Sequence, residues 1–461
     1  MTELDRVIGR LREIVGAAYV RVDDETRTKY GTDALKRGHP ADVVVIPAST
    51  EEIAAIAALC NETRTPLVPR GAGTGYTGGA VPVHGGVVLS LERLNKILEI
   101  DELNLLCVVE PNVITGDIQD AVEKVGLFYP PDPASLRQSA IGGNVAECAG
   151  GPRAFKYGVT KAYVLGLEAV LPSGEIIRSG GKVVKNVVGY DLTQLLVGSE
   201  GTLAIITKII LRLVPKPPVQ VTMRATFPSV RHAVNAVTNL IRERVVPAAL
   251  ELIDGDCLEA VAQALQVRSL APAGTAAMLL LEVDGIAEQT AAEALRVEKA
   301  CVAAGATEFL RAKDEAERQE LWRVRREIST SLKMITPLKF NHDVVVPKGR
   351  VPELFELVDG IKQQFKLRIP CFGHVGDGNI HVNIMVTPGD EDEIRRAHEA
   401  EGVLFRGAIA LEGSISGEHG IGFSKAPYLA MELTATTIET MKRVKLAFDP
   451  NGILNPGKIF S

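Results

Sequence analysis

The chain has 461 residues, of which 46% are hydrophobic, and it carries a formal net charge of −6. That length is too great for one ordinary hydrophobic core, so two or three domains are expected, and the composition excludes a disordered chain. Because positive and negative residues are interspersed, the basic surface typical of nucleic-acid binding is absent.

The sequence also predicts where the protein is located in the cell and what its cysteines do. No run of about 20 apolar residues could span a bilayer. The first 16 residues form a charged amphipathic pattern without the apolar stretch of a secretory signal, so we expect a cytoplasmic protein. The six cysteines, at 60, 107, 148, 257, 301 and 371, are widely spaced, which predicts neither an iron–sulfur cluster nor a zinc ribbon.

The first elements of the chain alternate between helix and strand. Residues 1–40 predict a helix followed by a polar loop, and residues 43–46 predict a short buried strand. Thr50 is the expected N-cap of a helix, because Glu51 and Glu52 follow in its first turn and apolar residues recur on one face. Another strand begins at Leu67 and leads into a cluster of glycines.

That cluster, residues 69–86, reads PRGAGTGYTGGAVPVHGG and contains a GxGxxG pattern. The dinucleotide-binding version of the pattern needs a helix at its third glycine, whereas glycines and prolines follow here and residues 87–91 favour a strand. We therefore expect a loop whose backbone N–H groups bind phosphate, with Arg70, Thr74 and Thr77 nearby. An ordinary glycine-rich hairpin is the alternative.

Two further glycine-rich segments follow. The first, SAIGGNVAECAGGPRAFKYG at residues 139–158, comes after a predicted strand at 105–109 and a predicted helix at 116–125. The second, GYDLTQLLVGSEGTLAIIT at residues 189–207, runs into a β-branched strand. Three such loops between short strands predict one elongated ligand lying against backbone, and a large phosphate-bearing cofactor fits that description.

The strongest catalytic signal is the stretch GHVGDGNIHVNI at residues 373–384. Its central glycines, aspartate and asparagine predict a turn. In the strand that follows, Ile380, Val382 and Ile384 point to one face, and His381 and Asn383 point to the other.

A second polar motif, SGEHGIG at residues 416–422, places Glu418 beside His419. Our hypothesis is that His374, His381 and Glu418 together form a donor set for a divalent metal, with positions left open for a substrate. Mixed nitrogen and oxygen ligands accept Zn, Mn or Fe. The alternative is that these histidines are hydrogen-bonded core residues.

These motifs, together with VGSEGTL and the terminal LNPGKIF, resemble the flavin-linked D-2-hydroxyacid dehydrogenases of the vanillyl-alcohol-oxidase type. That group includes the glycolate oxidase flavoprotein subunit, D-lactate dehydrogenases and D-2-hydroxyglutarate dehydrogenase. The resemblance covers nearly the whole chain in the right order. Its motifs do not choose among the members of the group.

The resemblance implies an α+β fold with three parts. Residues 1–215 would form a two-lobed vanillyl-alcohol-oxidase-type FAD-binding domain, and residues 219–412 a substrate domain with an antiparallel sheet covered by helices. Residues 413–461 would return to the FAD domain. The residues implied to contact FAD are Arg70, Gly71, Gly73, Thr74, Gly75, Tyr76, Thr77, Gly78, Gly79, Pro133, Ser139, Gly142, Gly143, Asn144, Gly151, Tyr157, Gly158, Glu200, Gly201, Ile205 and Asn455. Tyr76 stands where some relatives carry a flavin-linked histidine, so FAD is expected to be non-covalent.

The implied activity is FAD-dependent oxidation of a small D-2-hydroxy acid, with D-lactate or glycolate favoured. A metal on His374, His381 and Glu418 would lower the pKa of the substrate hydroxyl, His419 would accept its proton, and hydride would pass to flavin. The implied substrate-binding residues are Arg325, Lys339 and Asn383, and Arg325 would bind the carboxylate. The alternative for Arg325 and its neighbouring arginines is a solvated helix face.

Three other functions stay open. The chain could be a D-2-hydroxyglutarate dehydrogenase, although Ser329 stands where those enzymes carry a threonine. A metallohydrolase would leave the three glycine-rich loops unexplained, and a flavin-binding electron-transfer subunit without its own substrate would leave Glu418 beside His419 unexplained. The expected electron acceptor is an electron-transfer flavoprotein, an iron–sulfur subunit or a quinone. A homodimer, and attachment to a membrane through a partner, are both compatible with the sequence.

Overall fold

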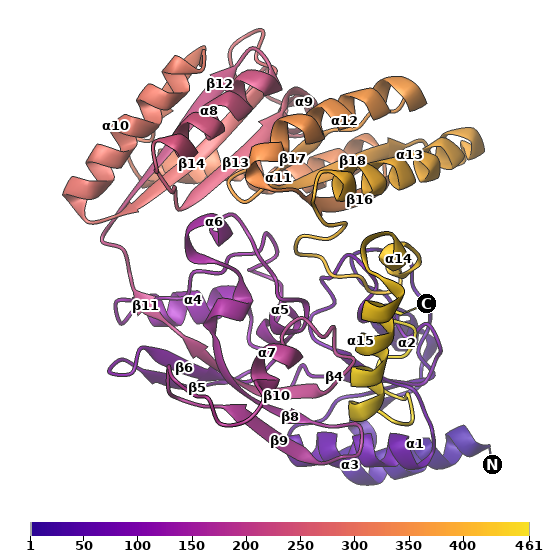
Figure 1. Ribbon diagram of the computed structural model, residues 1–461. Helices are drawn as coiled ribbons and strands as arrows, with labels where there is room; N and C mark the ends of the chain where they lie inside the picture. The colour runs from indigo at the N-terminus through magenta and orange to yellow at the C-terminus, as the bar shows by residue number, and fades with distance from the viewer. Residues whose placement is uncertain (1, 461) are drawn as a thin grey trace. The chain divides into compact units, whose positions relative to one another are not determined.

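The structure is a computed structural model that describes residues 2–460. The chain forms two compact units (Figure 1). The first unit contains the residues up to 150, residues 159–216 and the residues from 418 on, and the second contains residues 151–158 and 217–417. Both units mix helices with sheets, so the predicted α+β class is confirmed.

A small sheet forms one lobe of the first unit. Its strands are β1 (Val20–Arg21), β2 (Val43–Val45), β4 (Val87–Ser90) and β3 (Leu67–Arg70), in that order. The pairs β2–β4 and β3–β4 are parallel, and β1 pairs antiparallel with β2. The helices of this lobe are α1 (Glu3–Val15), α2 (Asp24–Tyr30) and α3 (Thr50–Glu62), and the 3₁₀ helix η1 spans Ala17–Tyr19.

Two predictions for this lobe were wrong. The N-cap of α3 is Ser49, whose hydroxyl accepts a hydrogen bond from the N–H of Glu52, so Thr50 is already inside the helix. The polar entry loop contains helix α2, which Asp23 caps through the N–H of Thr26. In both places a side-chain oxygen one residue before the helix satisfies one of the N–H groups that the first turn leaves without a partner.

A five-stranded antiparallel sheet forms the second lobe. Its order is β5 (Ile97–Asp101), β6 (Leu106–Val109), β10 (Ile205–Arg212), β8 (Val164–Val170) and β9 (Ile176–Gly180). A separate pair joins β7 (Leu127–Phe128) to β11 (Val214–Pro215). The helices are α4 (Thr115–Glu123), α5 (Ile141–Glu147), α7 (Leu192–Leu196) and the 3₁₀ helix η2 (Thr160–Tyr163). The two sheets are the two lobes that the sequence predicted.

The second glycine-rich segment is mainly helical, which corrects its prediction as a loop. Residues 141–147 form α5, and residues 154–157 form α6 (Ala154–Tyr157), which belongs to the second unit. Gly142 sits inside α5, where a Cβ would lie 2.7 Å from Cβ of Pro111. Glycine is used here for close packing of a helix, which outweighs its low helix propensity.

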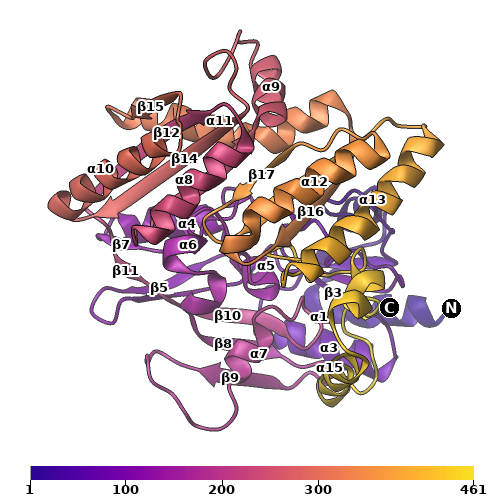
Figure 2. The same ribbon diagram turned by 45° about the horizontal axis from the view of Figure 1, so that its top comes forward.

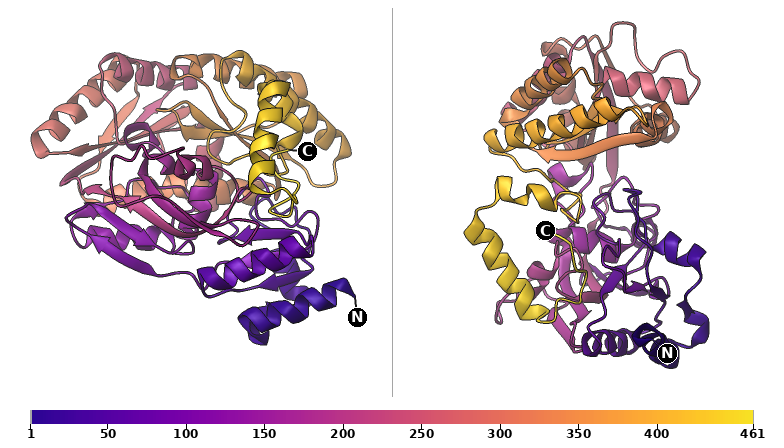
Figure 3. Two further views of the ribbon diagram at one scale, coloured as in Figure 1. Left: turned by 60° about the horizontal axis from the view of Figure 1, so that its bottom comes forward. Right: turned by 90° about the vertical axis from the view of Figure 1, so that its right-hand side faces the viewer.

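The C-terminal segment belongs to the first unit. It contains η4 (Ala426–Tyr428), α14 (Leu429–Glu432) and α15 (Ala435–Phe448). Leu454 then pairs in parallel with Leu67, and the N–H of Asn455 donates to the carbonyl of Leu67. Figure 3 shows this yellow segment beside the indigo and purple elements of the same unit.

One seven-stranded sheet organises the second unit. Its order is β15 (Glu308–Arg311), β12 (Val219–Phe227), β14 (Ala277–Gly285), β13 (Ala249–Asp254), β17 (Cys371–His374), β18 (Asn379–Val386) and β16 (Leu338–Val345). Every neighbouring pair is antiparallel, as predicted.

Helices cover this sheet on both faces. Helices α8 (Val230–Arg242), α10 (Ala287–Ala303), α12 (Val351–Phe365) and α13 (Glu391–Ala410) lie side by side across one face (Figure 2). Helices α9 (Gly255–Ala264) and α11 (Glu315–Ile335) pack together on the other, and η3 (Lys348–Arg350) precedes α12. The α11 face has an apolar core that includes Ile253, Phe372 and Ile328. Among the described helices, none is long and apolar enough to cross a membrane.

Candidate active site

A row of polar side chains interrupts the apolar α11 face of the second unit's sheet. In β17, Phe372 and His374 are two residues apart and therefore point to the same face. Phe372 pairs with His381 of β18, and paired residues of antiparallel strands share a face, so both histidines lie on the α11 side. The predicted alternation in β18 is confirmed, although both faces of the strand are buried.

Glu251 of β13 joins two of the predicted functional side chains. Its Oε1 lies 2.6 Å from Nδ1 of His374, and its Oε2 accepts a 2.5 Å hydrogen bond from Nε of Arg325. Burial opposes ionisation of Glu251, but the charges and hydrogen bonds of His374 and Arg325 outweigh that effect and lower its pKa to about 2. The carboxylate is therefore ionised at neutral pH.

Arg325 is not one of the solvated arginines of α11. It is only 6% exposed, whereas Arg326 is exposed and donates to the carbonyl of Gln319. The Arg325 guanidinium also lies 4.7 Å from the centre of the Phe372 ring, on the sheet beneath the helix. Its burial beside His374 places a fixed cation next to the candidate metal ligands.

The three predicted metal ligands come together. One ligand atom of each of His374, His381 and Glu418 lies within 4.8 Å of the others, and no other such group of histidine, cysteine and acidic side chains occurs in residues 2–460. Glu418 follows Gly417, whose N–H donates to the carbonyl and carboxylate oxygens of Asp343 on β16, the strand beside β18. The donor set suits a divalent metal, and the ion itself stays a prediction.

His419 lies against the first glycine-rich loop. Its ring stacks on Tyr76 with 5.3 Å between ring centres, and its carbonyl accepts a hydrogen bond from the Thr77 hydroxyl. Its Nε2 lies 4.0 Å from the carboxylate of Glu418. The candidate base is therefore held between the predicted FAD loop and a predicted metal ligand.

Lys339 and Asn383 form a second polar group on the same face. The ammonium of Lys339 donates to Oδ1 of Asn383 at 3.1 Å and to the Ser329 hydroxyl at 3.3 Å, and Asn341 also donates to Asn383. Burial lowers the pKa of Lys339 to about 8, and repulsion from Lys333 adds to the effect. A half-buried cation with neutral hydrogen-bond partners suits an anionic ligand group.

The first glycine-rich loop is braced from within the first unit. Arg70 is half-buried and donates to the carbonyl of Thr32, and its guanidinium packs against Gly73 of the loop. Gly78 has φ +81°, and a Cβ there would lie 2.0 Å from the ring of Phe423. Gly422 has φ +53°, and its Cβ would lie 2.1 Å from the carbonyl oxygen of Thr77. Only glycine allows these two segments to pack so closely.

Two other residues implied to contact FAD carry buried polar atoms that lack a partner in the described residues. The Ser139 hydroxyl and Oδ1 of Asn455 are buried without a hydrogen-bond partner, which is costly unless a ligand supplies one. Nδ2 of Asn455 donates to the carbonyls of Gly79 and Glu200. A ligand with hydrogen-bonding groups at these two positions would satisfy both atoms, so the residues present fit FAD, and their contact with it stays a prediction.

Other predicted FAD residues have structural partners. Glu200 accepts hydrogen bonds from the N–H groups of Ile421 and Gly422, so its carboxylate holds the segment that follows His419. Ile205 is buried in the core of the first unit. Tyr157 donates to Asp284 within the second unit. Direct contact of these residues with FAD stays a prediction.

The remaining predicted positions fall into a few places in the fold. The residues of the first loop lie between β3 and β4 and are Gly71, Gly73, Thr74, Gly75 and Gly79. Pro133 lies between β7 and α5, Gly143 and Asn144 lie in α5, and Gly201 lies between α7 and β10. Gly151 and Gly158 flank α6 in the second unit.

The sequence reasoning missed Glu251. Its only local signal is a glutamate flanked by Leu250 and Leu252 in β13, a strand that is buried along its whole length. A charged residue in such a strand needs partners, because an unpaired buried charge is unfavourable. That pattern could have identified Glu251 as a candidate, but it does not reveal the partners.

The fold and the buried polar site together define a flavoenzyme of the two-lobed FAD-binding type. The model of the C-terminal domain of FAD linked oxidases matches residues 216–459, and that of an FAD binding domain matches residues 41–180. Among solved structures, the chain is similar to a 4-ethylphenol oxidase from Gulosibacter chungangensis with a TM-score of 0.81, 21% identity and coverage of 100% of this chain and 98% of that one.

Several curated relatives are similar to the chain over nearly its whole length. The chain is 43% identical to glycolate oxidase subunit GlcD of Bacillus subtilis, over 91% of this chain and 89% of that protein. It is 36% identical to a D-lactate dehydrogenase of Anaerostipes hadrus, over 95% of this chain and 94% of that protein. It is 34% identical to a D-2-hydroxyglutarate dehydrogenase of Stutzerimonas stutzeri, over 99% of each chain. The chain belongs to the FAD-linked oxidase family, which confirms the resemblance seen in its sequence.

Proposed function

We propose that the protein oxidises a small D-2-hydroxy acid, D-lactate or glycolate, to the 2-oxo acid with the help of a divalent metal. The observation that carries the proposal is the convergence of His374, His381 and Glu418, with Arg325 joined to His374 through Glu251. Relatives named for glycolate and D-lactate support it, since they are 43% and 36% identical to this chain.

Each residue has a defined task in this proposal. FAD, when bound, supplies the two-electron acceptor, and a divalent ion on the three ligands would stabilise the deprotonated hydroxyl of the substrate. Arg325 and Lys339 bind the substrate carboxylate, and Asn383 orients the ammonium of Lys339. His419 accepts the hydroxyl proton, because it is the imidazole adjacent to a metal ligand and is not itself a ligand.

An anaerobic absorbance titration tests the proposal. We expect the yellow protein to be bleached by D-lactate or glycolate, and the bleaching to be lost after chelation and restored by added Zn²⁺ or Mn²⁺. L-lactate serves as the stereochemical control. Bleaching by D-2-hydroxyglutarate alone would reassign the substrate, and a protein that no hydroxy acid bleaches would contradict the proposed function.

FAD is proposed to be bound without a covalent link. The resemblance implies that Tyr76 stands where some relatives carry a flavin-linked histidine, and its ring stacks on His419. We expect all flavin to appear in the filtrate when the protein is denatured in guanidinium and passed through a size-cutoff membrane. Flavin retained with the polypeptide would contradict this prediction.

The affinity for the hydroxy acid is expected to depend on the charge of Lys339. Because burial lowers its pKa to about 8, the ammonium loses its proton as the pH rises through 8. KM should therefore rise above pH 8, approaching tenfold per pH unit, and Lys339→Met should have a high KM that stays flat between pH 7 and 9. A wild-type KM that does not change over this range would remove Lys339 from substrate binding.

The lowered pKa of Lys339 also makes the stability of the fold depend on pH. Rising pH should weaken substrate binding but increase the free energy of unfolding. Between pH 8 and about 10.5 the unfolded chain binds more protons at Lys339 than the folded chain does, so its contribution to the free energy of unfolding rises with pH. Comparison of wild type with Lys339→Met by urea denaturation at pH 7.5 and 9.5 isolates this contribution. This control separates loss of folding from loss of substrate affinity.

Electrons are proposed to leave the protein through an external acceptor. All six cysteines are free thiols, and five of them are buried. Their wide spacing in the sequence is the reason to expect no cluster within the chain. An electron-transfer flavoprotein, an iron–sulfur subunit or a quinone would each serve. The proposal places the protein in the cytoplasm, and it is compatible with a homodimer and with attachment to a membrane through a partner.

A further inference from the structure

Glu251 is shared between two side chains with different proposed tasks. One carboxylate oxygen bonds Nδ1 of His374, and the other bonds Nε of Arg325. The bond to Nδ1 fixes the imidazole ring and leaves Nε2 as its ligand atom. The bond to Nε fixes the guanidinium plane and leaves its two terminal nitrogens to bind a carboxylate.

The surroundings make Glu251 rigid. It is 0% exposed and lies on β13, which pairs with β14 on one side and β17 on the other. Arg325 comes from α11 and His374 from β17, so one carboxylate ties a helix to two adjacent strands. A small displacement of Glu251 would therefore move both of its partners.

We propose that Glu251 is a positioning residue that sets metal affinity and substrate-carboxylate affinity together. The inference rests on the proposed function, because it assumes the metal at His374 and the carboxylate at Arg325. A negative carboxylate on Nδ1 raises the basicity of a metal-binding histidine, and removal of such a partner lowers metal affinity about 10–100-fold. The same removal releases the guanidinium of Arg325 from its fixed plane.

Glu251→Gln is the direct test. A glutamine side chain has one oxygen acceptor in place of two. Its NH2 group would therefore face either the Nε–H of Arg325 or the Nδ1–H of His374, and two donors cannot form a hydrogen bond. We expect the affinity of the substrate-free, FAD-loaded enzyme for Zn²⁺ to fall about 10–100-fold, measured by competition with a chromophoric chelator. We expect KM for the hydroxy acid to rise at least fivefold when the enzyme is saturated with metal.

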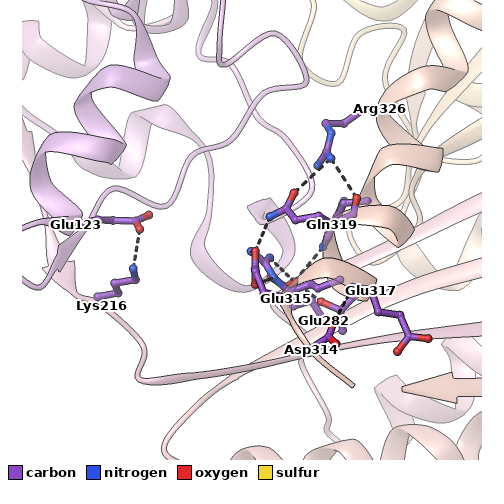
Figure 4. A network of polar contacts seen from close by, with 11 residues as sticks. Glu123, Lys216, Glu282, Asp314, Glu315, Glu317, Gln319 and Arg326 are labelled. Atoms are coloured by element: carbon purple, nitrogen blue, oxygen red, sulfur yellow. Dashed lines mark hydrogen bonds and ion pairs between the residues drawn. The ribbon is translucent and has the colours of Figure 1, made fainter. Parts of the chain in front are cut away.

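Glu282→Gln is the matched control. Glu282, labelled in Figure 4, is also a buried glutamate on this sheet. Its carboxylate accepts hydrogen bonds from Thr222 and from two residues of α11, Arg318 and Trp322. Its replacement disturbs the same helix and sheet without touching either histidine. The control should therefore lose stability while keeping the wild-type affinity for Zn²⁺ and the wild-type KM.

The outcomes separate this inference from the proposed function. If wild type shows metal-dependent bleaching but Glu251→Gln keeps its Zn²⁺ affinity and KM, the positioning role is wrong and the function stands. If wild type binds no metal, the proposed function is wrong, and the role of Glu251 that rests on it is wrong as well. Should Glu251→Gln not fold, Glu251→Asp keeps the charge but is one methylene shorter and cannot reach both partners. A folded Glu251→Asp enzyme with both wild-type values would overturn the inference.

Discussion

Replacing His419 with asparagine is expected to lower the rate constant for flavin reduction by a hydroxy acid about 10²–10⁴-fold. Asparagine keeps the size and polarity of the side chain but cannot accept a proton at neutral pH. His419 adjoins Glu418 in the chain and stacks on Tyr76, so it is the described imidazole that combines these two positions. Anaerobic stopped-flow absorbance with saturating substrate measures this rate.

The variant should keep both its FAD and its metal. The Thr77 hydroxyl bonds the backbone carbonyl of residue 419, and the metal-ligand group does not include the His419 side chain. His398→Asn is a matched control, because His398 is exposed on α13 and contacts Phe340. Fast flavin reduction in the His419 variant would remove this residue from the proton transfer.

Local sequence pattern was sufficient where neighbouring residues determine the structure. The alternation around His381 predicted which side chains of β18 share a face, and the glycines of the first loop excluded a dinucleotide-binding helix, as the structure confirms between β3 and β4. In each case the chemistry of consecutive residues fixes the backbone.

Local pattern failed where distant contacts decide. Residues 141–147 contain two glycines and still form α5, because Gly142 packs against Pro111. The carboxylate of Glu251 meets partners that lie 74 and 123 positions away, so its role depends on which strands are neighbours in the sheet. Sheet order is a property of the folded chain, and the sequence of β13 alone carries no information about it.

Local sequence also could not show which arginine of α11 is buried. From the helix pattern alone, Arg323, Arg325 and Arg326 could equally lie on a solvated face, and only the family resemblance favoured Arg325. In the structure, Arg323 pairs with Glu320 on the helix surface, whereas Arg325 is buried against Phe372. Which arginine is buried depends on which face of α11 packs on the sheet. That face is set by the apolar side chains of the core, such as Ile328 and Leu332.

Replacing Arg325 with lysine is expected to raise KM for the hydroxy acid about 10–100-fold at saturating metal. Lysine preserves the positive charge but lacks the planar fork that can bond Glu251 and a substrate carboxylate at the same time. The loss of one charge-assisted hydrogen bond, about 1.5–3 kcal/mol, sets this range. Steady-state kinetics with an artificial electron acceptor measures KM and kcat separately.

Arg325→Ala should have a larger effect for an additional reason. Removing one partner of a buried ion pair typically costs about 3–5 kcal/mol of stability, and His374 would then be the remaining partner of the Glu251 carboxylate. Thermal unfolding should therefore occur at a lower temperature in the alanine variant than in the lysine variant. Arg326→Ala is the control on the same helix, because Arg326 is exposed and bonds only Gln319 in the described contacts (Figure 4). If the lysine and Arg326 variants had the same KM as wild type, the carboxylate would have to bind elsewhere. Lys339, a half-buried cation on the same face of the sheet, would then carry that task.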